Sequence, residues 1–114
     1  MEFENGNVKL TVTGDTLCAH VSGEIDHHSS RTIREAIDAA LVSYSPDTLI
    51  MDVSGITFMD SSGLGLVLGR YTKASEAGIA FSVTGAGERV RKMFDMAGLD
   101  RIIDYKEKRN EKGM

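Results

Sequence analysis

Hydrophobic and polar residues alternate along two segments near the start of the chain. The alternation runs through residues 8–12 and returns in residues 17–21, with the turn residues Gly14 and Asp15 between the two segments. A period of two is typical of strands with one buried face, and the spacing indicates a short turn between them. We therefore expect an N-terminal β-hairpin whose second strand is interrupted at Gly23.

Three later segments carry apolar residues at the spacing of an amphipathic helix. The first follows Ser29 or Ser30, either of which can cap a helix, and ends at the loop of residues 45–47. The second begins at residues 60–62 and ends near residues 77–78, and the third ends at Gly98. Their expected core-facing stripes are Ile33, Ala36, Ile37, Ala40, Leu41 and Tyr44, then Leu64, Val67, Leu68 and Tyr71, then Val90, Met93, Phe94 and Ala97.

Two nearly continuous apolar runs separate the helices, at residues 49–53 and 79–83, and the first suits a strand covered on both faces. Residues 54–57 are interpreted as a short connection, and residues 102–103 as a short last strand or a docking segment. Strands that alternate with helices predict an α/β fold with parallel neighbours. We expect one domain over residues 1–114, with a mixed four- to five-stranded sheet, an N-terminal hairpin, packed helices and a frayed charged tail at residues 105–114.

The charge balance and the single cysteine narrow the classes of function. The chain has 114 residues, a formal net charge of -4 and a pI near 5.3, which argues against direct binding of nucleic acid or of an anionic membrane. It contains no apolar run as long as a membrane span and no N-terminal signal segment. Cys18 lies in an apolar strand pattern, which indicates a buried thiol in a reducing compartment. We therefore expect a cytoplasmic protein.

The start of the second helix has an unusual composition. Asp60, Ser61 and Ser62 are all good cap residues, because their oxygens can accept hydrogen bonds from first-turn N–H groups. Glycine costs about 1 kcal/mol relative to alanine inside a helix, yet Gly63, Gly65 and Gly69 follow directly. Close approach of another backbone or of a phosphate would explain them. Two interpretations stay open at this point, a plain helix cap and a functional hydroxyl.

Other candidate chemistry is weaker. His27-His28 together with His20 and Cys18 could suggest a metal, but no second well-spaced pair of ligands follows them. A serine hydrolase would need a nucleophile elbow, and the pattern Gly-x-Ser-x-Gly is absent around Ser61 and Ser62. We therefore expect neither a catalytic residue nor a metal site.

Several motifs together resemble bacterial anti-sigma-factor antagonists of the STAS domain family. The most specific is the string Asp60-Ser61-Ser62-Gly63-Leu64-Gly65. Residues 23–28, 68–71, 91–99 and 102–103 match as well, so the resemblance runs from about Val8 to Ile103. The histidine pair in residues 23–28 favours the sporulation branch of the family over the general-stress branch.

The resemblance implies a switch rather than an enzyme. Such proteins bind an anti-sigma factor that is also a serine kinase, and this frees the sigma factor. The kinase then uses its own ATP to phosphorylate the first serine, here Ser61, with Ser62 as the second choice, until a serine phosphatase reverses the reaction. The chain itself would need no cofactor. The expected partner-binding residues are Asp26, Asp60, Ser62, Gly63, Leu64 and Gly65.

Elementary electrostatics agrees with this switch. A phosphoserine carries about -1.5 to -2 charges, which a helix N-terminus tolerates but a buried interface beside Asp60 does not. Gly63 and Gly65 are expected to leave room for a kinase loop at Ser61. Three alternatives stay open. They are a general-stress regulator, a scaffold module of the same fold that is never phosphorylated, and a small enzyme using Ser61, His27 and Asp26.

Overall fold

The N-terminal hairpin is present in the computed structural model, which describes residues 2–106. Strands β2 (Val8–Thr13) and β3 (Thr16–Ile25) pair antiparallel around Gly14, whose φ of 60° suits a residue without a side chain. A short strand, β1 (Glu2–Asn5), pairs antiparallel with β2 and forms one edge of the sheet. The prediction of the hairpin is therefore correct, and β1 is an addition to it.

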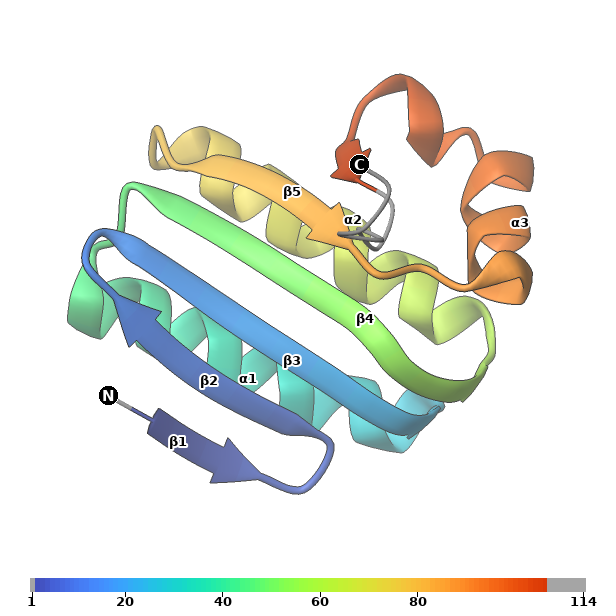
Figure 1. The fold of residues 1–114 in the computed structure, drawn as a ribbon, viewed down its shortest axis with the longest axis horizontal. Coiled ribbons are helices and arrows are strands. Elements are labelled where there is room, and N and C mark those ends of the chain that lie inside the picture. The colour runs from blue at the N-terminus through green and yellow to red at the C-terminus, as the bar shows by residue number, and fades with distance from the viewer. Residues whose placement is uncertain (1, 107–114) are drawn as a thin grey trace, which may run out of the picture.

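The rest of the sheet is parallel. Strands β4 (Thr48–Met59), β5 (Ala80–Thr84) and β6 (Asp104–Lys106) follow β3 in order, each parallel to its neighbour. The sheet therefore runs β1-β2-β3-β4-β5-β6 and is mixed (Figure 1). The α/β class and the mixed sheet with its hairpin are confirmed, and the short edge strands β1 and β6 bring the strand count within residues 2–106 to six.

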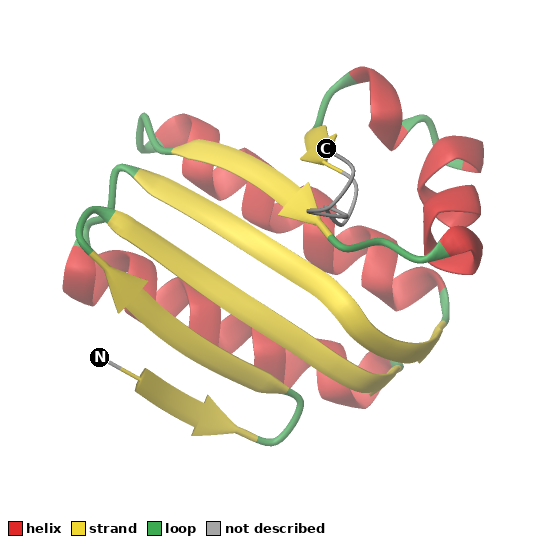
Figure 2. Cartoon of the chain, in the orientation of Figure 1, coloured by secondary structure: helices red, strands yellow, loops and turns green. Residues whose placement is uncertain are grey.

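Two long helices cover one face of this sheet (Figure 2). They are α1 (His27–Tyr44) and α2 (Ser61–Glu76), while α3 (Glu88–Met96) and the short 3₁₀ helix η1 (Leu99–Arg101) lie beyond the end of β5. The core lies between sheet and helices, and each fully buried aliphatic side chain contributes about 1.5–3 kcal/mol. Its fully buried members include Leu17, Val21, Ile25, Ile33, Ile37, Leu49, Met51 and Val53.

The expectation that β4 is covered on both faces is wrong. Leu49, Met51 and Val53 are buried, but Ile50 and Asp52 between them are only half-buried. Both crossovers, β3 to α1 to β4 and β4 to α2 to β5, advance in the same direction across the sheet. Because such crossovers are right-handed, they place both helices on one face and leave the other without a helix over β4.

Strand β4 is also longer than predicted. Residues 54–57 continue the strand instead of forming a connection, since Gly55 pairs with Ser22 and Ile56 with Gly23. A Cβ at Gly55 would come within 2.9 Å of the Ser22 side chain, so the glycine permits close packing of the two strands. Several residues in this half of β4 are exposed, and it therefore lacks the apolar run that marked the first half.

The structure differs from the prediction in where α1 begins and in which residues of α2 are buried. Helix α1 begins at His27 with Asp26 as its cap, not at Ser29 or Ser30. In α2 the predicted stripe is partly wrong, because Leu68 is 39% exposed while Leu66 and Arg70 are buried. The ends near residues 77–78 and at Gly98 are confirmed.

The last part of the chain differs from its prediction as well. Ile103 is buried and Ile102 is about half exposed, but neither lies in a strand. The final strand is β6, so Tyr105 and Lys106 belong to the sheet and not to a frayed tail. Residues 107–114, the remainder of the predicted tail, lie outside the described residues. None of the helices in residues 2–106 is long and apolar enough to cross a membrane.

Candidate functional site

Helices α1 and α2 begin side by side, at the carboxyl ends of the neighbouring strands β3 and β4. Ile25, the last residue of β3, is in register with Met59, the last residue of β4. The Asp60 N–H donates to the Ile25 carbonyl oxygen at 3.0 Å, which fixes the two strand ends to each other. Asp26 follows Ile25 and caps α1, and Asp60 follows Met59 and caps α2. Asp26, one of the expected partner-binding residues, therefore lies at the same strand ends as Asp60.

Asp26 forms a complete capping box at the start of α1. Its Oδ1 accepts from the N–H groups of His28 at 3.0 Å and Ser29 at 2.9 Å, and its own N–H donates to the Ser29 hydroxyl at 3.0 Å. The hydrogen bond from the Ser29 N–H is the largest factor that lowers the pKa of this exposed carboxyl below its usual value. Asp26 therefore presents a negative charge at neutral pH.

Asp60 caps α2 and positions the two serines. Its Oδ1 accepts from the Ser62 N–H at 2.8 Å, while its carbonyl oxygen accepts from the Gly63 N–H at 3.0 Å. Ser61 is the first residue of α2 and is exposed, whereas Ser62 is half-buried. Among the described residues, the Ser61 hydroxyl has no hydrogen-bond partner. The geometry thus leaves one accessible hydroxyl at a helix N-terminus, where a negative charge is favoured.

The glycines after Ser62 have different roles. Gly63 is buried, and a Cβ there would overlap the Met59 side chain, so this glycine admits Met59 into the core. Gly63 therefore has a packing role inside the protein, and its assignment to the partner-binding residues stays a prediction. Leu64 is half-buried and packs against the core. Gly65 is exposed, and a Cβ there would meet nothing within 4 Å, which leaves its face of α2 open.

Phe58 is a candidate contact residue that the sequence analysis missed. It lies near the end of β4 and is 50% exposed, although phenylalanine is usually buried. It lines a pocket of about 200 Å³ between β4 and the start of α3, with Met93 and Val90 on the α3 side. The signal was present in the sequence, because strand alternation places Phe58 on the face opposite the buried Met59.

The histidines do not form a site with Ser61. His27 and His28 are exposed in the first turn of α1, and no hydrogen bond joins His27 to Ser61 within residues 2–106. His20 pairs instead with Asp52 at 3.0 Å on the sheet face opposite the helices, and Cys18 beside it is half-buried, not fully buried as expected. In this part of the chain, no group of three or more His, Cys, Asp or Glu residues could hold a metal ion.

Comparison with known proteins agrees with this geometry. Residues 7–112 match the family described as the STAS domain. The anti-sigma F factor antagonist of Lysinibacillus sphaericus is 38% identical over 88 residues, which are 77% of this chain and 75% of that protein. The anti-sigma-B factor antagonist of Bacillus subtilis is 30% identical over 104 residues, 91% of this chain and 94% of that protein.

Solved structures show the same similarity. The anti-sigma factor antagonist SpoIIAA in its unphosphorylated form has a TM-score of 0.78 and 32% identity, covering 93% of this chain and 91% of its own. The Bacillus cell fate determinant SpoIIAA in the phosphorylated form has a TM-score of 0.73 and 31% identity, covering 93% and 95%. Antagonists of this family are regulatory binding proteins and not enzymes. The chain therefore belongs to the STAS domain family, among its anti-sigma factor antagonists.

Proposed function

We propose that this antagonist is a switch controlled by phosphorylation of Ser61. The unphosphorylated chain binds an anti-sigma factor that is also a serine kinase, and so releases the sigma factor. Transfer of a phosphate from the kinase's ATP to the Ser61 hydroxyl ends the binding, and a serine phosphatase restores it. The observation that carries the proposal is the exposed Ser61 at the first position of α2, directly after the cap Asp60 and at the strand ends that also carry Asp26.

The fold tolerates a phosphate at this position. The first turn of α2 presents backbone N–H groups and the positive end of the helix dipole, both of which favour a negative charge. The Ser62 N–H already donates to Asp60 Oδ1, and because Ser61 is exposed, a phosphate on its hydroxyl would lie in solvent and not in the core. Phosphorylation is therefore expected to change binding and not folding.

A phosphate on Ser61 is expected to weaken the interface with the anti-sigma factor. A phosphoserine adds about -1.5 to -2 charges next to the carboxylates of Asp26 and Asp60. A partner surface that fits a neutral hydroxyl would have to bury this charge and accept the repulsion. A penalty of about 4 kcal/mol would weaken binding by about a thousandfold.

The sporulation branch is favoured over the general-stress branch. The chain is 38% identical to an antagonist of anti-sigma F factor and 30% identical to an antagonist of anti-sigma-B factor, and it contains the histidine pair His27-His28. The proposal requires no cofactor in this chain, because ATP is bound by the kinase. It places the protein in the cytoplasm, where its partners act, and involves no direct contact with nucleic acid or membrane.

A release assay tests the proposal. The sigma factor is first bound to its anti-sigma factor, and the chain is then added before or after treatment with kinase and ATP. We expect the untreated chain to displace the sigma factor and the treated chain to leave the complex intact. A chain that binds the anti-sigma factor but never acquires phosphate would instead be the scaffold module, and labelling of Ser61 in the isolated chain by an activated phosphonate would indicate an enzyme.

A further inference from the structure

Two glycines on the outer surface of α2 have no structural reason to be glycine. Gly65 and Gly69 lie one turn apart on the same face of the helix, and a Cβ at either position would meet nothing within 4 Å. Neither has a positive φ. Each costs about 1 kcal/mol relative to alanine inside a helix. The fold itself would therefore be more stable with side chains at both positions, which indicates that something outside the chain uses the space.

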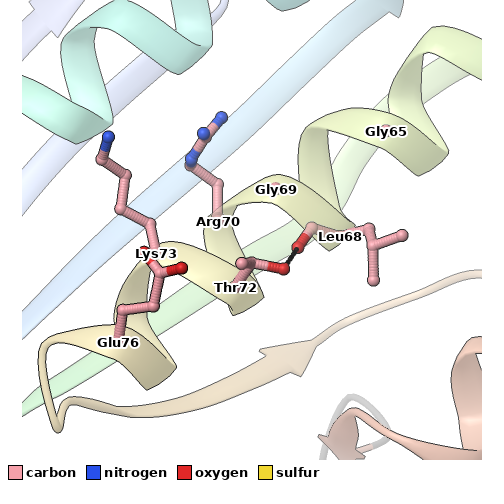
Figure 3. A pocket seen from close by; sticks show the side chains of 7 residues that line it. All are labelled: Gly65, Leu68, Gly69, Arg70, Thr72, Lys73 and Glu76. Atoms are coloured by element: carbon pink, nitrogen blue, oxygen red, sulfur yellow. Dashed lines mark hydrogen bonds between the residues drawn. The ribbon is translucent and has the colours of Figure 1, made fainter.

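The glycines form the middle of a long groove. One part, about 460 Å³, is lined by residues spaced three and four apart along α2, from Gly65 to Glu76 (Figure 3). This spacing keeps the groove on one side of the helix for about three turns, or about 16 Å. A second part, about 360 Å³, shares Gly65 and Gly69 and extends toward His27, Ser30 and Arg34 of α1. An open groove of this length along one side of α2 suits a helix laid alongside it.

A buried arginine between the two helices lines both parts of the groove. The Arg70 side chain is 6% exposed, and its Nε lies 2.9 Å from Asp38 Oδ1 of α1, although this ionic contact lacks the alignment of a hydrogen bond. The Arg70 Nη1 is also buried and has no hydrogen-bond partner among the described residues. A guanidinium presents five N–H donors, so this one is under-satisfied as it stands.

Most of the charged residues that line the groove are positive. Arg34, Arg70 and Lys73 line it, against Glu76 alone. Burial lowers the pKa of the Arg70 guanidinium, the positive charge of Arg34 acts in the same direction, and Asp38 opposes both. A single carboxylate between Arg34 and Arg70 would relieve the repulsion between the two cations and supply the missing acceptor.

We propose that the face of α2 with Gly65 and Gly69 is a docking surface for a helix of the protein partner, and that an acidic side chain of that helix pairs with Arg34 and Arg70. The inference rests on the proposed function, because the partner is the anti-sigma factor. The glycines let the helix backbone approach closely, and the cations select a carboxylate at one end of the contact. Ser61 at the first turn of α2 then lies at the end of the same surface.

Binding of the full chain to the anti-sigma factor tests this surface by titration calorimetry. Gly69→Leu fills the groove and Arg34→Glu reverses its charge, and each is expected to weaken binding about tenfold or more. The matched controls are Ala39→Leu and Arg31→Glu, which add the same groups to exposed positions of α1 that do not line the groove. Both controls are expected to bind like the unchanged chain, and circular dichroism is expected to show all four variants folded.

The outcomes separate this inference from the proposed function. If the unchanged chain does not bind the anti-sigma factor at all, the proposed function fails and the inference fails with it. If it binds, but Gly69→Leu and Arg34→Glu bind equally well or the controls weaken as much, only the docking surface is overturned. A loss of self-association in Gly69→Leu with unchanged partner binding would also overturn it, because the groove would then hold a second copy. A weaker salt dependence of binding in Arg34→Glu than in Arg31→Glu supports the carboxylate contact.

Discussion

The Asp60 N–H donates to the Ile25 carbonyl oxygen at 3.0 Å, across the ends of two adjacent parallel strands. This hydrogen bond has a consequence for function, because the residues that follow Ile25 and Met59 are the caps of α1 and α2. The two carboxylates of Asp26 and Asp60 are therefore held at the same carboxyl ends of β3 and β4 that carry Ser61. A phosphate added there meets negative charge that the fold has already placed.

Replacement of Ser61 by aspartate is expected to imitate the modified state. Ser61→Asp adds a charge at an exposed helix start, where it is tolerated, so the circular dichroism spectrum and the melting temperature should stay close to those of the unchanged chain. Affinity for the anti-sigma factor should fall by about tenfold or more, since aspartate carries less charge than phosphoserine. Titration calorimetry measures the affinity. Equal affinities of the two proteins would remove the electrostatic basis of the switch.

The two glycines next to the serines are expected to respond to alanine in opposite directions. Gly63→Ala places a Cβ against Met59 and should lower the free energy of unfolding by about 1–3 kcal/mol. Gly65→Ala enters open space and should raise it by up to about 1 kcal/mol. Urea unfolding followed by circular dichroism measures both. Destabilisation by both substitutions to the same extent would show that Gly65 is also constrained by internal packing.

Phe58 is expected to contribute to binding and little to folding. It is half exposed at the end of β4, so Phe58→Ala should leave the melting temperature within a few degrees of the original. Exposed aromatic side chains beside a contact site often carry binding energy, and a loss of about 1–2 kcal/mol of binding free energy is expected. Val42→Ala, at a position 79% exposed on α1, is the control. If both variants bind alike, the surface beside Phe58 is not contacted.

The Asp52 carboxylate is expected to make the free energy of unfolding depend on pH in the acidic range. Burial alone would raise the pKa of its carboxyl, but hydrogen bonds from the Ser54 N–H at 3.0 Å and from His20 at 3.0 Å outweigh burial and lower it. A carboxyl with a lowered pKa stabilises the fold at pH values above its unfolded pKa, and this stabilisation is lost as pH falls through the folded pKa. Urea midpoints at pH 7 and pH 3 should therefore differ less in Asp52→Asn than in the unchanged chain. An unchanged difference would show that other carboxyls cause the acid sensitivity.

Much of the fold could be predicted from periodicity because the hairpin, α1 and the first half of β4 have strong patterns. The second half of β4 could not, since exposed residues such as Ser54 and Thr57 interrupt the pattern while the backbone continues to pair with β3. The start of α1 was also missed. Serine and aspartate are both good caps, and the choice of Asp26 depends on where β3 ends.

The structure places the predicted site residues around the start of α2, but some of their contacts could not be predicted from the sequence. Ser61 is exposed as expected, whereas the position of Gly63 inside the core depends on Met59, and no local pattern reveals that contact. Arg70 was noted only as part of the matching residues 68–71, and its burial was not predicted. An arginine on a helix is usually exposed, and only the packing of α1 against α2 buries this one beside Asp38.

The most direct test of the central claim is the intact mass of serine variants after incubation with the kinase and ATP. The unchanged chain and Ser62→Ala are each expected to gain a single phosphate, and Ser61→Ala is expected to gain none while still binding the anti-sigma factor. The two variants remove the same hydroxyl group from adjacent positions, so a difference between them assigns the acceptor. Full phosphorylation of Ser61→Ala, or loss of phosphorylation in Ser62→Ala alone, would contradict the account.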